Sequence, residues 1–231
     1  MKCFKQILAV STILWTSIAS GQQAFEDKLQ DWIPPNQSDY SGVYELGQQE
    51  RQAFLRVIST PNYKVFQLKT NFQYKVGGPR DIRFNTYSNP TIDEQGNVNF
   101  GGHEGKFVKY CDFFGDTIYT IKFKPAITDF SPLDELGKRK NLESSYKGKF
   151  IQASTIELTV SDLTGLTPKE LQIMRNEIFA RYGYTFKEGG EMARYFNNQY
   201  WYKPERTEVI ELLTELEKSN IQLIQNEEAS R

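Results

Sequence analysis

Between residues 41 and 124, short runs of β-branched and aromatic residues alternate with turn-forming residues. In the run 119–124, Tyr119, Ile121 and Phe123 fall on one side of an extended chain, and the residues between them are polar. This period of two predicts strands with one buried and one solvated face. Strands are expected at 41–46, 53–59, 63–70, 81–87, 97–100, 105–111 and 117–124, and 146–158 is an eighth candidate.

The segments between these runs contain glycine, proline and asparagine, which suit tight reversals. Because the turns recur at short intervals and no helical stretch is long enough for a crossover, the sheet is expected to be antiparallel. Eight strands suffice for a closed barrel or a sandwich, and the sequence leaves both open. The basic triplet Lys138-Arg139-Lys140 is interpreted as an exposed connector ahead of the last strand.

From residue 167 the pattern becomes helical. Thr167, Pro168 and Glu170 supply a hydroxyl N-cap, a proline at the first helical position and an acid that closes a capping box. This helix is expected to run to about Tyr182 and to stop at Gly183, and further helices are expected at 190–197 and 205–226. The prediction is an α+β chain with an antiparallel all-β barrel or sandwich at 41–159 and a small α-helical module at 160–231.

The first 21 residues have the pattern of a signal peptide. Lys2 and Lys5 precede an apolar run at 7–19, and small residues precede a possible cleavage site after Gly21. The run has about 13 residues, fewer than the roughly 20 of a spanning helix, and a retained anchor is the alternative. We expect a polar segment at 22–40 to begin the mature chain, with no transmembrane span after cleavage and a periplasmic or extracellular location.

Charge and composition exclude several classes of protein. The 28 Lys and Arg residues nearly balance 29 Asp and Glu residues, which argues against nucleic acid as a partner. One histidine and two cysteines exclude multi-histidine metal sites and disulfide scaffolds, so no metal site, cofactor or catalytic residue is predicted. Cys3 should leave with the leader, and Cys111 is expected to be buried near Phe113 and Phe114. The roles of Cys111 and of His103, which is placed in a flexible glycine loop, stay open.

Residues 171–184, which read LQIMRNEIFARYGY, resemble the core of the YARHG domain, named for a Tyr-Ala-Arg-His-Gly motif. Over residues 160–226 further marks of that family follow in order: Phe186, Tyr195-Phe196, Trp201-Tyr202-Lys203-Pro204, Leu216-Glu217 and Asn220-Ile221. The resemblance implies a bacterial, extracytoplasmic protein. It also implies a domain that occurs beside varied partners and has no assigned molecular function.

Two positions depart from the motif, because Phe179 replaces its first tyrosine and Tyr182 replaces its histidine. A tyrosine keeps its proton up to about pH 10, so Tyr182 is unsuited to a proton-shuttle role near neutral pH. The sequence therefore favours a binding accessory over an enzyme.

The motif has a structural interpretation. Arg175 falls on the apolar side of the first helix and needs a buried partner, for which Glu217 is the candidate. Glu177 and Arg181 form an (i, i+4) pair. Asn220 is expected to satisfy backbone groups at a helix or loop end. The full set of structural motif residues is Arg175, Asn176, Glu177, Arg181, Gly183, Trp201, Tyr202, Pro204, Glu217 and Asn220.

Aromatic residues crowd the segment 179–202, and the consecutive rings at 200–202 cannot all point inward. Tyr182, Tyr200 and Trp201 are the candidate contact residues for a partner, either a cell-wall glycan or another envelope protein. The predicted function is a non-catalytic envelope or extracellular binding protein. Two alternatives stay open: a carrier of a small apolar ligand inside the β module, and a cell-wall-associated hydrolase with two convergent titratable groups in a cleft.

Overall fold

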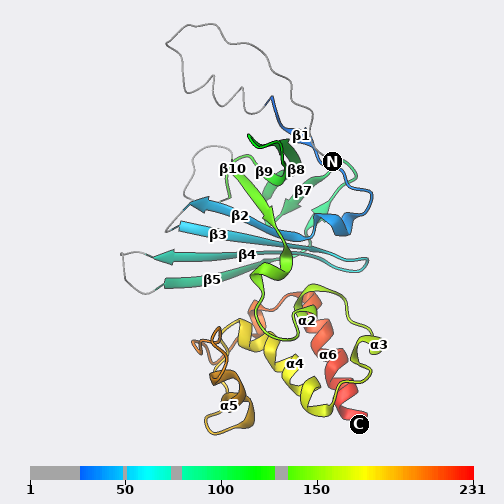
Figure 1. The fold of residues 1–231 in the computed structure, drawn as a ribbon, viewed down its shortest axis with the longest axis vertical. Coiled ribbons are helices and arrows are strands. Elements are labelled where there is room, and N and C mark those ends of the chain that lie inside the picture. The colour runs from blue at the N-terminus through cyan, green and yellow to red at the C-terminus, as the bar shows by residue number, and fades with distance from the viewer. Residues whose placement is uncertain (1–26, 49–50, 74–79, 128–134) are drawn as a thin grey trace, which may run out of the picture.

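The computed structural model describes residues 27–48, 51–73, 80–127 and 135–231 (Figure 1). A curled antiparallel sheet occupies the first part of the chain, and a group of short helices lies against one end of that sheet. The predicted signal peptide lies outside the described residues. Within the described part, no helix has the length and apolar character needed to cross a membrane.

In the described part of the chain the sheet contains ten strands, and its hydrogen-bonded order is β5-β4-β3-β2-β10-β9-β8-β7-β6, with β1 added to β8. The strands are β1 (Gln30–Asp31), β2 (Gly42–Gln48), β3 (Arg51–Ser59), β4 (Lys64–Gln73), β5 (Arg80–Tyr87), β6 (Thr91–Ile92), β7 (Asn97–Phe100), β8 (His103–Cys111), β9 (Thr117–Phe123) and β10 (Glu135–Lys140). All these pairings are antiparallel, which confirms the predicted α+β class. The sheet curls into a half-barrel, and this pairing path does not join β5 to β6.

Aromatic and branched side chains fill the concave side of the half-barrel. The rings of Tyr40 and Phe107 stack with centroids 4.0 Å apart, and those of Phe66 and Phe100 lie 4.7 Å apart. Among the described residues this interior is therefore a packed core, whereas the ligand-carrier alternative requires an empty cavity. The other large buried side chains here are Tyr44, Leu46, Leu55, Ile121 and Phe123.

The face of β9 that was predicted to be solvent-exposed is only partly exposed. Thr120 is fully buried, and its hydroxyl donates to the carbonyl of Gly137 on the neighbouring strand β10 at 2.7 Å. The basic triplet 138–140 belongs to β10, between β2 and β9, so its interpretation as a connector was wrong. The sequence signal was missed because charged residues on a strand look like a solvated loop.

The predicted strand at 146–158 is also wrong, because this segment folds with the helices. It contains α2 (Gln152–Thr155), and Phe150, Ala153 and Leu158 belong to the helical core. The side chain of Asn220 accepts a hydrogen bond from the Leu158 amide and donates to the carbonyls of Ala153 and Ile156. These backbone groups thus find partners without a neighbouring strand.

The remaining helices are α3 (Val160–Leu163), α4 (Pro168–Arg181), α5 (Glu191–Asn197) and α6 (Glu215–Ala229), with 3-10 turns η1 (Gln37–Tyr40), η2 (Leu142–Ser145) and η3 (Ile210–Leu212). The start of α4 is confirmed, because Thr167 and Glu170 form a reciprocal capping box around Pro168. Gly183 follows with a φ of 79°, a left-handed conformation that suits glycine. The short helix predicted at 190–197 is confirmed as α5.

The last helix begins ten residues later than predicted, at Glu215 instead of 205. Thr214 caps it, because its hydroxyl accepts from the Glu217 amide while the Glu217 carboxylate accepts from the Thr214 amide. The sequence prediction did not use this capping box, although Thr214 and Glu217 have the required spacing.

The turn between β8 and β9 is exposed, which contradicts the expected burial near Cys111. Cys111 ends β8 on the surface, and Phe113 keeps 92% of its accessible area. Asp112 holds this turn, because its carboxylate accepts from the amides of Phe114 and Asp116. His103 is the first residue of β8, and its ring lies 5.7 Å from that of Tyr87.

The capping box at 214–217 provides a test of where α6 begins. Thr214→Ala should lower the free energy of unfolding by about 1–2 kcal/mol, because the buried cap hydroxyl and both of its hydrogen bonds with Glu217 are lost. Thr207→Ala, an exposed position inside the helix that the sequence predicted, should change it by less than about 0.5 kcal/mol. Urea unfolding measures both, and equal small effects would contradict the observed start of α6.

Candidate functional site

The YARHG-like motif lies where the helices pack on the sheet. The C-terminal end of α4 faces the outer side of β3, β4 and β5, opposite the half-barrel core (Figure 1). On this side Arg56, Gln67 and Thr86 are cross-strand neighbours. Beside them, Ile58 and Val65 pack against Leu216 of α6. We call this contact between sheet and helices the junction.

Tyr182 is the central side chain of the junction. It is 1% exposed, and its hydroxyl donates to Oε2 of Glu217 at 2.7 Å and accepts from Nε2 of Gln67 at 3.0 Å. Its ring packs edge-to-face on Phe84 with centroids 4.8 Å apart. Burial, with the nearby Glu217 carboxylate, raises the pKa of Tyr182 well above its usual value. Tyr182 therefore cannot be the surface contact residue that the sequence suggested.

Gln67 connects the sheet to two parts of the helical region. Its amide nitrogen also donates to the carbonyl of Leu212 at 3.0 Å, and Thr86 donates to the same carbonyl at 3.2 Å. Its amide oxygen accepts from Nη1 of Arg56 at 2.9 Å. The Arg56 guanidinium lies over the ring of Tyr146, 4.5 Å from the centroid. The sheet thus contributes buried polar side chains that hydrogen-bond to the end of α4 and to the segment just before α6.

The expected pair between Arg175 and Glu217 does not form. Arg175 pairs instead with Glu228, with Nε and Oε2 3.0 Å apart and both side chains 21% exposed. The helices α4 and α6 run antiparallel, so Tyr182 at the end of α4 meets Glu217 at the start of α6, and Arg175 meets the end of α6. Glu217 is fully buried and accepts from Tyr182 and Thr214.

Glu177 and Arg181 form a buried pair that also orders the preceding loop. The Glu177 carboxylate accepts from the amides of Lys149 and Phe150 at 2.8 and 2.7 Å, and from the Arg181 guanidinium. Arg181 also donates to the hydroxyl of Ser154 at 2.8 Å. Burial lowers the pKa of Arg181, and Glu177 opposes that shift. Gly148 has a φ of 114°, and a side chain there would collide with the Glu177 carboxylate.

The other predicted motif residues are spread over the helical region. Asn176 donates to the carbonyl of Gln172 at 2.7 Å. Tyr202 is buried and donates to the carbonyl of Tyr184 at 2.6 Å, while Pro204 is exposed. Tyr200 is 87% exposed and Trp201 is half-buried.

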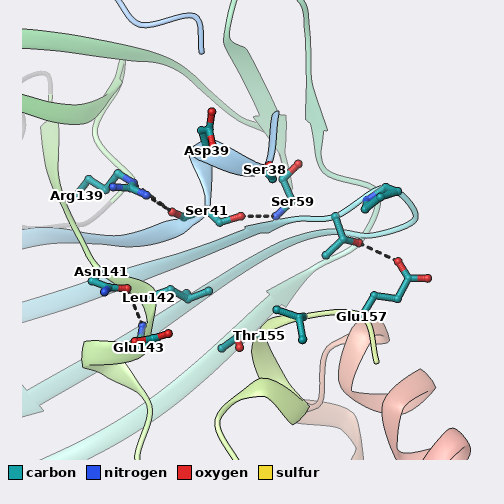
Figure 2. Close-up of a pocket in the computed structure, with 13 residues that line it drawn as sticks. Ser38, Asp39, Ser41, Ser59, Arg139, Asn141, Leu142, Glu143, Thr155 and Glu157 are labelled. Atoms are coloured by element: carbon teal, nitrogen blue, oxygen red, sulfur yellow. Dashed lines mark hydrogen bonds between the residues drawn. The ribbon is translucent and has the colours of Figure 1, made fainter. Parts of the chain in front are cut away.

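A groove opens at one edge of the junction (Figure 2). It has a volume of about 530 Å³ and is bordered by the start of β2, the end of β3, the end of β10 and the residues after α2. A smaller groove of about 320 Å³ lies between Arg175, Phe179 and Val209. Among the described residues, no three His, Cys, Asp or Glu side chains gather closely enough to hold a metal ion.

Sequence reasoning missed the sheet's share of the junction. Arg56 and Gln67 sit within apolar strands, at positions that alternate with core residues, and such positions normally face water. Two polar residues on the outer face of a strand do not indicate that another part of the chain will cover them.

The hydroxyl of Tyr182 provides a test of the junction. Tyr182→Phe should lower the free energy of unfolding by about 2–3 kcal/mol, because the buried Gln67 and Glu217 each lose a hydrogen-bond partner. Tyr200→Phe is the matched control and should change it by less than about 0.5 kcal/mol. Similar results for the two variants in urea unfolding would show that the hydroxyl does not hold the junction.

The raised pKa of Tyr182 also predicts a pH dependence. Above about pH 10 the tyrosines of the unfolded chain lose their protons, while the folded chain keeps Tyr182 protonated. The folded state then binds more protons, so stability should fall as pH rises, by about 1.4 kcal/mol per pH unit for each such group. Urea unfolding from about pH 9 to 11 should give a shallower fall for Tyr182→Phe than for the wild type. If the stability of the variant and of the wild type fell equally with pH, the raised pKa of Tyr182 would be contradicted.

Comparison with known proteins identifies the helical region only. Neither the curated proteins nor the solved structures include a match to this chain. A family model described as "YARHG domain" matches residues 147–229, which contain α2 to α6 and the junction residues Tyr182, Leu212, Leu216 and Glu217. The C-terminal part of this chain is therefore a YARHG domain.

Proposed function

We propose that this is an exported, non-catalytic binding protein of the cell envelope, in which the YARHG domain is a docking module held against a β half-barrel. One observation carries the proposal. Of the titratable motif residues, Glu177, Arg181 and Glu217 are buried and hydrogen-bonded to other parts of the same chain, and the partly exposed Arg175 is paired with Glu228. Groups in this state have no access to a substrate, which argues against a reaction centre at the motif and does not favour the hydrolase alternative.

Export is supported by the leader pattern, in which Lys2 and Lys5 precede an apolar run that ends before Gly21. The YARHG match at residues 147–229 supports this location, because the resemblance to that family implies an extracytoplasmic protein. Cleavage after Gly21 leaves Gln22 as the first residue of the mature chain.

Exposed aromatic rings supply a contact surface for an envelope component such as cell-wall glycan. Tyr200 projects from the YARHG domain beside the half-buried Trp201. A tyrosine ring offers an apolar face and a hydroxyl together, a combination that is common at binding surfaces. On the sheet, Phe113 and Phe114 form a second exposed aromatic pair, with centroids 5.6 Å apart.

Export and binding can be tested separately. When the full chain is expressed in a bacterial host, N-terminal sequencing of the exported protein should begin at Gln22. The purified mature chain should co-sediment with isolated cell-wall sacculi, and Tyr200→Ser should reduce the bound fraction at least three-fold because it removes an exposed stacking face. Ile33→Ser, at another exposed apolar position, is the control and should leave the bound fraction unchanged.

An unprocessed chain that stays in the cytoplasm would refute export. Binding to sacculi that is absent, or equal in the two variants, would refute the proposed contact surface. Phe113→Ser, measured in the same assay, reports whether the β8–β9 turn contributes.

A further inference from the structure

Lys69 lies on the outer face of the sheet, at the border of the junction. Its strand, β4, runs between β3 and β5 (Figure 1). The direct partners of Lys69 in these two antiparallel pairings are Phe54 and Phe84. Opposite residues of such a pairing share a face of the sheet, so a phenylalanine flanks Lys69 on each side. The lysine Nζ lies 5.5 Å from the centre of the Phe84 ring, which gives the amine an apolar neighbour.

The amine of Lys69 has no partner, yet it keeps contact with solvent. Within the described chain it makes no hydrogen bond and no ion pair, whereas Lys106, Lys149 and Lys218 are each paired with a carboxylate. The Lys69 side chain is half-buried, and Nζ is not one of the fully buried atoms of the described chain that lack a partner. An unpaired amine outside that set retains accessible area, so a small molecule can reach it.

Two guanidinium groups face the same ring as Lys69. The guanidinium carbons of Arg56 and Arg206 lie 5.7 and 6.0 Å from the Phe84 centroid. Hydrogen bonds hold both groups in place, because Arg56 donates to Gln67 at 2.9 Å and Arg206 donates to a carbonyl of β5 at 2.7 Å. The ring attracts each cation weakly, whereas the three positive charges repel one another.

These surroundings disfavour the protonated form of Lys69. Burial, followed by the charge of Arg56, lowers the pKa of Lys69 to about 8. Glu205 opposes this shift and Arg206 adds to it, but the Glu205 carboxylate already pairs with Arg206 at 3.3 Å. At pH 7 such an amine is about one-tenth neutral, against less than about a thousandth for an ordinary lysine. The neutral amine is the form that attacks a carbonyl carbon.

We propose that Lys69 is a nucleophilic amine that captures small aldehydes with an apolar body as a Schiff base. The nitrogen attacks the aldehyde carbon, the aldehyde oxygen leaves as water with the two amine hydrogens, and a C=N bond remains. A desolvated lysine beside another cation is activated for this chemistry. The flanking rings of Phe54 and Phe84 offer apolar contact to the body of the aldehyde. The inference goes beyond the proposed function and does not depend on Tyr200.

The experiment is imine trapping on the mature chain. The chain is incubated at pH 7 with benzaldehyde and sodium cyanoborohydride, which transfers hydride to the imine carbon while water supplies a proton to the nitrogen. Peptide mass spectrometry then measures the benzylated fraction of each lysine. Lys69 should be labelled at least five-fold more than the exposed Lys187. The ratio should fall at least five-fold from pH 7 to pH 9, because an ordinary exposed amine gains far more neutral form over this range.

Substitutions of the flanking charges test their effect on Lys69. Arg206→Gln removes one cation and should lower the labelling of Lys69 at least two-fold, whereas Arg206→Lys keeps the charge and should leave it unchanged. Glu205→Gln removes the opposing acid and should raise the labelling about two-fold. Glu208→Gln, an exposed acid of the same loop, is the control. If Arg206→Gln does not fold, Glu205→Gln and its control decide the test.

Labelling of Lys69 that is no greater than that of Lys187, or a ratio that does not change with pH, would overturn the inference. Unchanged labelling in both Arg206→Gln and Glu205→Gln would do the same. Retention on sacculi that depends on Tyr200, together with an unreactive Lys69, would leave the proposed function in place and remove only this site. A reactive Lys69 without retention on sacculi would keep this site and remove the proposed attachment to the cell wall.

Discussion

The arrangement of the whole molecule depends on one hydrogen-bonded chain that crosses from the sheet to the helices, from Arg56 through Gln67 and Tyr182 to Glu217. Each member is buried, so none can return to water without opening the contact between the two parts. Buried polar groups of this kind add specificity as well as attraction, because a shifted contact would leave several of them without partners. The apolar contact of Leu216 with Ile58 and Val65 alone would tolerate sliding.

Within the YARHG domain, motif side chains replace regular secondary structure as backbone partners. Glu177 receives the amides of the loop at 149–150, and Asn220 holds the backbone of residues 153–158. Arg206 reaches from the loop before α6 to the carbonyl of Ile82 on β5. A domain with short helices and long connections needs such side chains, because its loop backbone is buried and must be hydrogen-bonded. These motif side chains thus stabilise the backbone of the domain.

Docking also forms a groove at the edge of the junction. The buried polar side chains of the motif already have hydrogen-bond partners inside the junction. The surface beside them is formed jointly by residues of the sheet and residues of the helices. The groove is lined by Ser59 from β3, Glu143 from η2 and Thr155 from α2, so both the sheet and the helices contribute to it.

Local patterns in the sequence determined much of the chain's secondary structure. Alternation marked seven strands, and the cap at Thr167 with the stop at Gly183 marked α4, because these signals come from residues that are close in the chain. The motif residues likewise identified the YARHG domain. Tertiary structure alone decided the rest. Only the tertiary structure shows that residues 135–140 form a strand of the sheet and that residues 146–158 pack with the helices. It also shows that Glu217 is hydrogen-bonded to Tyr182 and that Arg175 is paired with Glu228. These contacts join residues that are far apart in the sequence. The antiparallel packing of α4 and α6 decides which side chains of the two helices lie close together, and the local spacing of residues contains no information about that packing.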